Sequence, residues 1–293
     1  MKRMTKERKE SVSAILTGDW HLREDSPVCR TDDFETTQWR KVRFIAELQK
    51  KHQCPVLHSG DLFDHWKASP ALLSKTIAHL PDQFYSVVGN HDLPQHSLEL
   101  LWKSGVNVLI EAGKLNLLSE VHWEQTPKEG SLIFGDRKIL VWHIMTWTRK
   151  QPWPGCSDPS AKILLKKYPK FDLILTGHNH QTFVEELDGR ILVNPGCITR
   201  QTADQENHQP SVFLWYAKSN LIEQVFLPYE ENVISREHIE QGVKKDARIA
   251  AFVERLNTEW QKGVSFEDNL EKFEQVNRIP KSIMEIVRKA IEE

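Results

Sequence analysis

The sequence predicts an α/β fold built around one large core. Short runs of β-prone residues recur along the chain, and segments with helical periodicity separate them. A length of 293 residues allows one large α/β core, or one such core with a small appendage. The composition, 39% hydrophobic and 27% charged with a formal charge of −2, excludes a disordered chain and gives no overall sign of a polyanion-binding protein.

The predicted strands are short apolar runs, as expected for strands that are buried on both faces of a sheet. Eight runs fit this description: Val12–Thr17, Pro55–Ser59, Phe84–Val88, Lys138–Trp142, Phe171–Thr176, Arg190–Val193, Ser211–Tyr216 and Leu221–Leu227.

Helical periodicity predicts four helices within the same region. They are Thr36–Lys51, Pro70–His79, Ser97–Lys103 and Pro159–Lys167. We expect Asp158 to cap the last helix, because proline is favoured in the first turn and Pro159 follows Asp158 directly.

Beyond about Glu230 the pattern changes to long, charged helical stretches. The predicted helices are Arg236–Lys262, Phe266–Gln275 and Lys281–Ile291. We therefore expect a main domain at residues 1–230 and a small helical appendage at residues 231–293. The appendage either shields an edge of the sheet or binds a partner.

Five of the predicted strands end directly at a cluster of polar residues. The clusters are Asp19-Trp20-His21, Gly60-Asp61-Leu62-Phe63-Asp64, Gly89-Asn90-His91-Asp92, His143, and Gly177-His178-Asn179-His180. Ligands of open α/β sheets bind beyond the carboxyl ends of strands, so clusters distant in sequence can meet there. Their carboxylates, amide and imidazoles are the ligands of two adjacent divalent metal ions.

Individual residues in these clusters suit different roles. A bend at the strand exit lets Asp19 and His21 face one ion, and the two carboxylate oxygens of Asp61 can bridge two ions. The amide oxygen of Asn90 is a neutral ligand. His91 is left for proton donation, and Asp92 is a candidate to orient it by a hydrogen bond.

The remaining histidines complete the set. His178 and His180 are two residues apart, so in an extended segment they point to the same face and each can serve one of two neighbouring ions. His143 alone fits a structural role as well as a ligand role.

The order of these motifs resembles that of the calcineurin-like metallophosphoesterase superfamily over about Ser11 to Arg200. The resemblance implies a four-layer α-β-β-α sandwich as the catalytic domain. It also implies one ion held by Asp19, His21, Asp61 and His180, a second held by Asp61, Asn90, His143 and His178, and an acid role for His91. Manganese is the favoured ion by resemblance, while the ligand types also suit iron or zinc.

Within that superfamily the chain is most similar to SbcD-type DNA-repair nucleases. The similarity lies in Gly18–Leu22, Gly60–Asp64, Val87–Pro94 and Asn194–Arg200. It implies a manganese-dependent DNA nuclease, an exonuclease or an endonuclease, with an SMC-like ATPase as a partner and a homodimer as a candidate assembly. Some relatives carry a histidine at the position of Asp64, and His65 follows it here.

Two other functions stay open at this point. A small-molecule phosphoesterase, such as a cyclic-nucleotide phosphodiesterase or a nucleotidase, would use the same ions. A catalytically silent interaction scaffold is less consistent with a full set of seven ligands.

Local features bear on the substrate and the compartment. Loop tryptophans and basic patches are candidate nucleic-acid contacts: Trp20, Trp66, Trp147 and Trp153, with Lys2–Lys9, Arg149-Lys150 and Lys162–Lys170. Trp39, Trp102, Trp142 and Trp215 are expected in the core. The four cysteines lack metal or disulfide spacing, and no apolar run is long enough to span a bilayer, so we expect a cytoplasmic protein without membrane contacts.

Overall fold

The computed structural model describes residues 10–118, 123, 125, 132–259 and 266–292. The chain divides into two compact units, Met1–Ser235 and Arg236–Glu293. The first unit extends to Ser235 because this segment pairs with the loop that precedes the first helix. The N–H of Ser235 donates to the carbonyl of Cys29 at 2.7 Å, and Arg30 forms a β-bridge with Ile234.

The first sheet has six strands in the order β11-β10-β1-β2-β3-β4. Its strands are β1 Ala14–Thr17, β2 Val56–His58, β3 Phe84–Ser86, β4 Asn116–Leu117, β10 Ser211–Tyr216 and β11 Leu221–Phe226. β1 to β4 run parallel, and β10 and β11 join them as an antiparallel hairpin. The parallel strands therefore end at a common edge, where three of the polar clusters follow.

The second sheet has five strands in the order β5-β6-β7-β9-β8. Its strands are β5 Leu132–Phe134, β6 Arg137–His143, β7 Leu173–Gly177, β8 Phe183–Leu187 and β9 Arg190–Asn194. β6, β7 and β9 are parallel. The two remaining clusters lie at the ends of β6 and β7.

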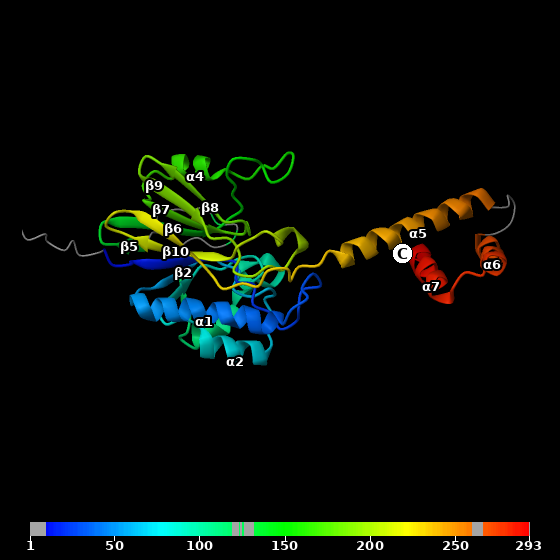
Figure 1. The fold of residues 1–293 in the computed structure, drawn as a ribbon, viewed down its shortest axis with the longest axis horizontal. Coiled ribbons are helices and arrows are strands. Elements are labelled where there is room, and N and C mark those ends of the chain that lie inside the picture. Colours follow the sequence, from blue (N-terminus) through cyan, green and yellow to red (C-terminus); the bar gives the residue numbers. More distant parts are fainter. Residues whose placement is uncertain (1–9, 119–122, 124, 126–131, 260–265, 293) are drawn as a thin grey trace, which may run out of the picture. The chain divides into compact units, whose positions relative to one another are not determined.

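Three apolar clusters define four layers, and Figure 1 shows the same order within this unit. The helices α1 Phe34–His52, α2 Pro70–His79 and α3 Gly105–Glu111 cover the outer face of the first sheet. The inner faces of the two sheets pack on each other, and α4 Ala161–Lys167 covers the outer face of the second sheet. The predicted α-β-β-α sandwich is confirmed.

Alternation along the strands produces these layers. In β1, Ile15 packs in the helix-facing cluster, while its neighbours Ala14 and Leu16 pack between the sheets. In β7, Ile174 faces α4, while Leu173 and Leu175 face the first sheet. Successive side chains of a strand point to opposite faces, so each strand contributes to two layers.

Some elements differ from the sequence-based expectation. α3, β4, β5 and β8 were not predicted, and the segment predicted as a helix at Ser97–Lys103 forms a 3₁₀ helix, Leu98–Lys103. α4 begins at Ala161, and its N-cap is Ser160, whose side chain accepts from the N–H of Ile163. The short strands escaped prediction because two to five residues carry little periodic signal.

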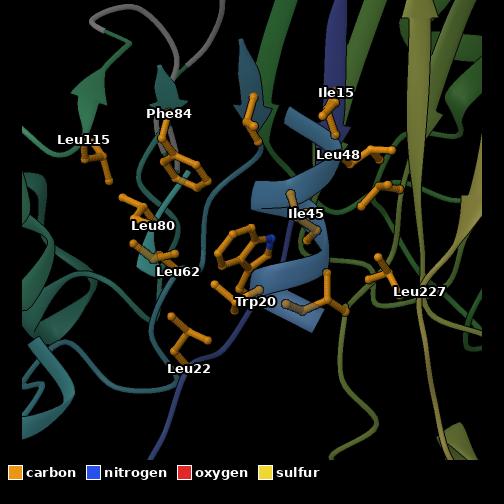
Figure 2. Close-up of a cluster of buried hydrophobic side chains, with 14 of the residues drawn as sticks. Ile15, Trp20, Leu22, Ile45, Leu48, Leu62, Leu80, Phe84, Leu115 and Leu227 are labelled. Carbon is orange, nitrogen blue, oxygen red and sulfur yellow. The ribbon is translucent and has the colours of Figure 1, made fainter. Parts of the chain in front are cut away.

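Two tryptophans lie in unexpected environments. Trp20 was a candidate for base stacking, but its side chain is fully buried among Leu22, Ile45 and Leu62 beneath the first sheet (Figure 2). Its Nε1–H donates to Thr17 Oγ1 at 2.8 Å. Trp102, expected in the core, is 66% exposed because the 3₁₀ helix that carries it buries none of its residues.

In its described residues the second unit forms three helices, α5 Glu237–Glu259, α6 Phe266–Asn277 and α7 Lys281–Glu292. Leu270, Phe273 and Met284 form a small apolar cluster between α6 and α7. Across the described residues, none of the helices combines the length and the apolar character that crossing a bilayer requires.

Candidate metal centre

The carboxyl ends of both sheets bring the predicted ligands together. Asp19, Asp61 and Asn90 follow β1, β2 and β3, while His143 ends β6 and His178 follows β7. All seven predicted ligands, Asp19, His21, Asp61, Asn90, His143, His178 and His180, take part in contacts between these strand ends.

One half of the site gathers ligand atoms from both sheets. Nε2 of His143 lies 3.3 Å from Asp61 Oδ2 and 3.1 Å from Asn90 Oδ1. Nδ1 of His178 lies 2.9 Å from the same Asn90 oxygen. These spacings match neighbouring ligands of one octahedral ion, which lie roughly 3 Å apart when each metal bond is about 2.1 Å.

The other half of the site contains the remaining ligands. Nε2 of His21 lies 3.0 Å from Nε2 of His180, 3.6 Å from Asp61 Oδ2 and 4.0 Å from Asp19 Oδ1. Ligand atoms of Asp19, His21 and His180 all lie within 4.8 Å of one another. Asp61 is thus near both groups, as a bridging carboxylate must be.

The donor chemistry of the site fits cations. Nδ1 of His143 donates to the carbonyl of Ser59 at 2.7 Å, so Nε2 is the nitrogen that faces the oxygens of Asp61 and Asn90, and it presents a lone pair to them once its proton is displaced. Lone pairs that face one another in a buried site repel unless a proton or a metal cation lies between them. The hydrogen bond from Nδ1 also fixes the ring, as is usual for metal-binding histidines.

Four of these residues hold an uncommon backbone conformation. The φ angles of Asp19, His21, Asp61 and His178 are 48°, 44°, 56° and 77°. Only a few per cent of non-glycine residues adopt the left-handed conformation, with asparagine, aspartate and histidine the most frequent, and such residues cluster at functional sites. The bends direct the side chains into the site. The bend at His178 is stabilised because the N–H of His178 donates to Asp19 Oδ1 at 2.9 Å.

Two glycines permit the close approach of the strand ends. A Cβ on Gly60 would lie 2.6 Å from Nδ1 of His143, and a Cβ on Gly89 would lie 2.1 Å from Oδ1 of Asp61. Neither position leaves room for a side chain, so the glycine in each motif is a packing requirement of the site.

Burial and neighbouring charges shift the pKa values of the ionisable side chains in the site. Burial opposes a charge on His143, but the carboxylates of Asp61 and Asp19 and the carbonyl of Ser59 together outweigh it and raise the pKa of His143 to about 9. Burial raises the pKa of Asp19 to about 8 and lowers the pKa of both His178 and His180 to about 4. Low pKa values keep these imidazoles neutral at pH 7, the state in which they bind metal.

His91 lies at the open side of the site. Its N–H donates to Asp61 Oδ1 at 2.8 Å, and its ring Nδ1 donates to the carbonyl of Asp64 at 2.7 Å. The residue is exposed, and its ring contacts that of His21 with centroids 4.7 Å apart. Because Nδ1 is occupied, Nε2 is the nitrogen available to a substrate.

Asp92 does not have the role expected from the sequence. We expected it to orient His91, but the carbonyl of Asp64 does so. The buried carboxylate of Asp92 instead accepts from the backbone N–H groups of Leu62, Phe63 and Gly89 at 3.1–3.3 Å. It therefore joins the loop after β2 to the loop after β3 and positions the ligands that both loops carry.

Sequence analysis missed several residues around the site. The ring of Trp123 lies 4.8 Å from that of His178, and Gln205 Nε2 lies 3.4 Å from Nδ1 of His180. Arg23 pairs with Asp64 at 3.0 Å, and Asp64 Oδ1 lies 3.6 Å from His21 Nδ1. Trp123, Gln205 and Arg23 lie outside the motifs read from the sequence, so only the tertiary structure identifies them.

The other proposed contacts have mixed outcomes. His65 is exposed, and its Nδ1 accepts from the N–H of Lys67 rather than from a group of the site. Trp147 is half-buried with its Nε1–H bound to the carbonyl of Asp158, while Trp153 is 48% exposed. Lys2–Lys9 lie outside the described residues.

Comparison with known proteins identifies the family. Residues 13–218 match the calcineurin-like phosphoesterase superfamily domain. The chain is similar to the DNA double-strand break repair protein Mre11 of Haloferax volcanii, with 25% identity over 214 residues, which is 66% of this chain. It spans about half, 47%, of the length of that relative.

Solved structures also align with this chain. A novel archaeal phosphodiesterase aligns at 15% identity with a TM-score of 0.43, covering 73% of this chain and 99% of that chain. The protein TT1561 of Thermus thermophilus aligns at 13% identity with a TM-score of 0.45, covering 74% of this chain and 100% of that chain.

Proposed function

Because this chain belongs to the calcineurin-like phosphoesterase superfamily, we propose that it is a dinuclear-metal phosphodiesterase and that its substrate is DNA. The observation that carries the proposal is the position of Asp61. Its Oδ2 lies 3.3 Å from Nε2 of His143 and 3.6 Å from Nε2 of His21, so this carboxylate adjoins both groups of ligands, which suits a bridge between two ions.

Each ion would have four protein ligands. Asp19, His21, Asp61 and His180 would hold one, and Asp61, Asn90, His143 and His178 would hold the other. Manganese is our preferred metal, and iron or zinc also suits imidazole and carboxylate ligands. When bound, the two ions supply a hydroxide at neutral pH and positive charge for the phosphate oxygens.

The protein groups account for the rest of the chemistry. His91 has Nε2 free on the open side, so in its protonated form it would donate a proton to the leaving oxygen. Asp64 orients the ring of His91 through its carbonyl, and Asp92 holds the loops that carry Asp61 and Asn90 in register.

DNA is favoured by two observations. The relative from Haloferax volcanii is a DNA double-strand break repair protein. In addition, the loop after His143 exposes Trp153 together with Arg149 and Lys150, a combination of aromatic and basic side chains that suits nucleic acid. Nuclease action in DNA repair, an SMC-like ATPase partner, a homodimer and a cytoplasmic location belong to the same proposal.

A small phosphoester is the second candidate substrate. A cavity of about 760 Å³ adjoins His178 and His180, and this volume is typical of small-molecule sites. A nucleotidase or a cyclic-nucleotide phosphodiesterase would use such a cavity directly.

One panel of assays tests the proposal. The protein is loaded with manganese and given linear duplex DNA, single-stranded DNA, a cyclic nucleotide and bis(p-nitrophenyl) phosphate, with Asp61→Asn as the control. Cleavage of DNA by the wild type, but not by Asp61→Asn, supports the proposal. Hydrolysis of small esters without DNA cleavage would replace DNA with the second candidate, and inactivity on all four substrates would favour a silent scaffold.

A further inference from the structure

A cavity of about 760 Å³ shares a wall with the metal centre. His178 and His180 are part of its lining, as are six residues between Thr202 and Gln209. Strands β8, β10 and β11 contribute aromatic side chains, among them Phe183 and Phe226. A phosphate bound at the metal centre would therefore have this cavity beside it.

The charge of the cavity differs from that of a site for a phosphate backbone. Its lining, as far as the structure describes it, includes neither lysine nor arginine, and Asp204 is its acidic residue. Proteins that bind the backbone of nucleic acids neutralise phosphates with cationic side chains. The cavity therefore suits an uncharged part of a substrate.

The polar groups of the cavity suit a partner with several donors and acceptors. The side-chain amides of Gln181 and Asn207 line it and make no hydrogen bonds among the described residues. Gln209 and Gln224 are already engaged, with Tyr229 and Ser211 respectively. Unengaged amides that can both donate and accept are the groups that read the edges of nucleobases.

The cavity also has an aromatic surface. Phe226, the last residue of β11, is 53% exposed although it is a large apolar side chain. An exposed aromatic ring beside amide groups can stack on the face of a base. Phe183 and Met145 supply further apolar lining.

From this composition, and resting on the proposed function, we infer that the cavity binds the nucleobase of a nucleotide whose phosphate lies at the metal centre. The substrate is then an unpaired nucleotide unit, whether at the end of a DNA strand or free in solution. A base within an intact duplex is stacked and paired, so entering the cavity requires that it first leave the stack.

The test compares two chromogenic phosphodiesters that differ in the base. Thymidine 5′-(p-nitrophenyl phosphate) carries a base, and bis(p-nitrophenyl) phosphate does not. We expect the wild type to have a lower KM for the first ester. Phe226→Ala should reduce the ratio of kcat/KM between the two esters about tenfold, and Asn207→Ala should reduce it about fivefold.

Two variants control for indirect effects. Phe226→Trp restores an aromatic surface and should recover most of the ratio. Gln241→Ala removes an exposed amide from α5 in the second unit, and the ratio should stay at the wild-type value. Phe226 and Asn207 are both exposed, so their substitution should leave the protein folded, which circular dichroism checks.

A binding measurement separates this inference from the proposed function. Calorimetric titration of the protein with thymidine, in the presence of EDTA, needs no catalysis. Thymidine binding to the wild type that is weaker in Phe226→Ala supports the base site. If neither ester is hydrolysed, that result contradicts only the proposed function. Hydrolysis of both esters with an unchanged ratio in Phe226→Ala, together with absent thymidine binding, would overturn the base site and leave the phosphodiesterase in place.

A last comparison distinguishes the two sources of the nucleotide. Single-stranded oligonucleotides with a normal or an abasic terminal nucleotide are compared with a free nucleotide that is itself a phosphodiester, thymidine 3′,5′-cyclic monophosphate. Preference for the normal end over the abasic end indicates a strand terminus in the cavity, and turnover of the free nucleotide alone indicates a small substrate. Equal rates for the normal and abasic ends, with no turnover of the monophosphate, would contradict the inference.

Discussion

The carboxylate of Asp61 and the imidazole of His143 meet across the two sheets, with Oδ2 3.3 Å from Nε2. Asp61 follows β2 of the first sheet and His143 ends β6 of the second. Both side chains are almost fully buried. The contact therefore ties the metal centre to the packing of the whole sandwich, and it requires either a proton or a cation between the two groups.

Loss of one charge at Asp61 should abolish turnover. Asp61→Asn keeps the size of the side chain but weakens the bridge between the ions, so we expect kcat to fall about 10³-fold or more. Steady-state kinetics and elemental analysis of bound manganese measure the two effects. Wild-type turnover in this variant would contradict the role of Asp61.

Removal of His91 should separate metal binding from catalysis. His91 is exposed and its Nδ1 is held by a backbone carbonyl, so His91→Ala should bind manganese as the wild type does. Its rate should fall about 10²- to 10⁴-fold, the usual contribution of a general acid. His65→Ala, which removes a neighbouring exposed imidazole, is the matched control and should keep its rate.

Bound metal should stabilise the fold. A ligand that binds only the folded state at 100 times its Kd adds about 2.7 kcal/mol to the free energy of unfolding. Manganese should therefore raise the Tm of the wild type measured by calorimetry, and EDTA should reverse the rise. The same addition to His178→Ala should produce a much smaller shift. An equal rise in both proteins would show that manganese acts elsewhere.

Loss of the charge on Asp92 should lower the stability of the fold. Asp92→Asn places an amide N–H₂ against backbone N–H donors, which leaves buried groups unsatisfied at a cost of about 1–3 kcal/mol. Urea denaturation in EDTA measures this loss without any contribution of metal. Asp82→Asn, at an exposed site, should change stability little.

Lys41 should make stability depend on pH. Burial lowers the pKa of this α1 lysine to about 7, so between pH 7 and about 10.5 the unfolded chain binds more protons than the folded one. Stability then rises with pH across that window, by at most about 1.4 kcal/mol per pH unit. Lys41→Met should be more stable at pH 7 and should lose this part of the slope in urea denaturation at pH 7 and pH 9. Parallel slopes for the two proteins would refute the assignment.

The sequence alone predicted the α/β class, the main strands and the order of the motifs. Buried strands such as β6 and β7 are continuous apolar runs, and each ends where a glycine or a histidine begins a polar cluster. These signals lie within short segments of the chain, so they can be recognised without knowledge of the tertiary structure. Short elements such as β4 and β8, and the 3₁₀ helix that exposes Trp102, carry too little local signal.

Only the tertiary structure decided what the polar residues contact. Asp92 stands beside His91 in sequence, yet it binds the loop backbone, because the chain turns between the two residues and the donors of another loop lie nearer. Trp20 stands between two candidate ligands, yet it is in the core. The site and its cavity are made by segments that are far apart in the chain, and the distances between such segments depend on how the two sheets pack.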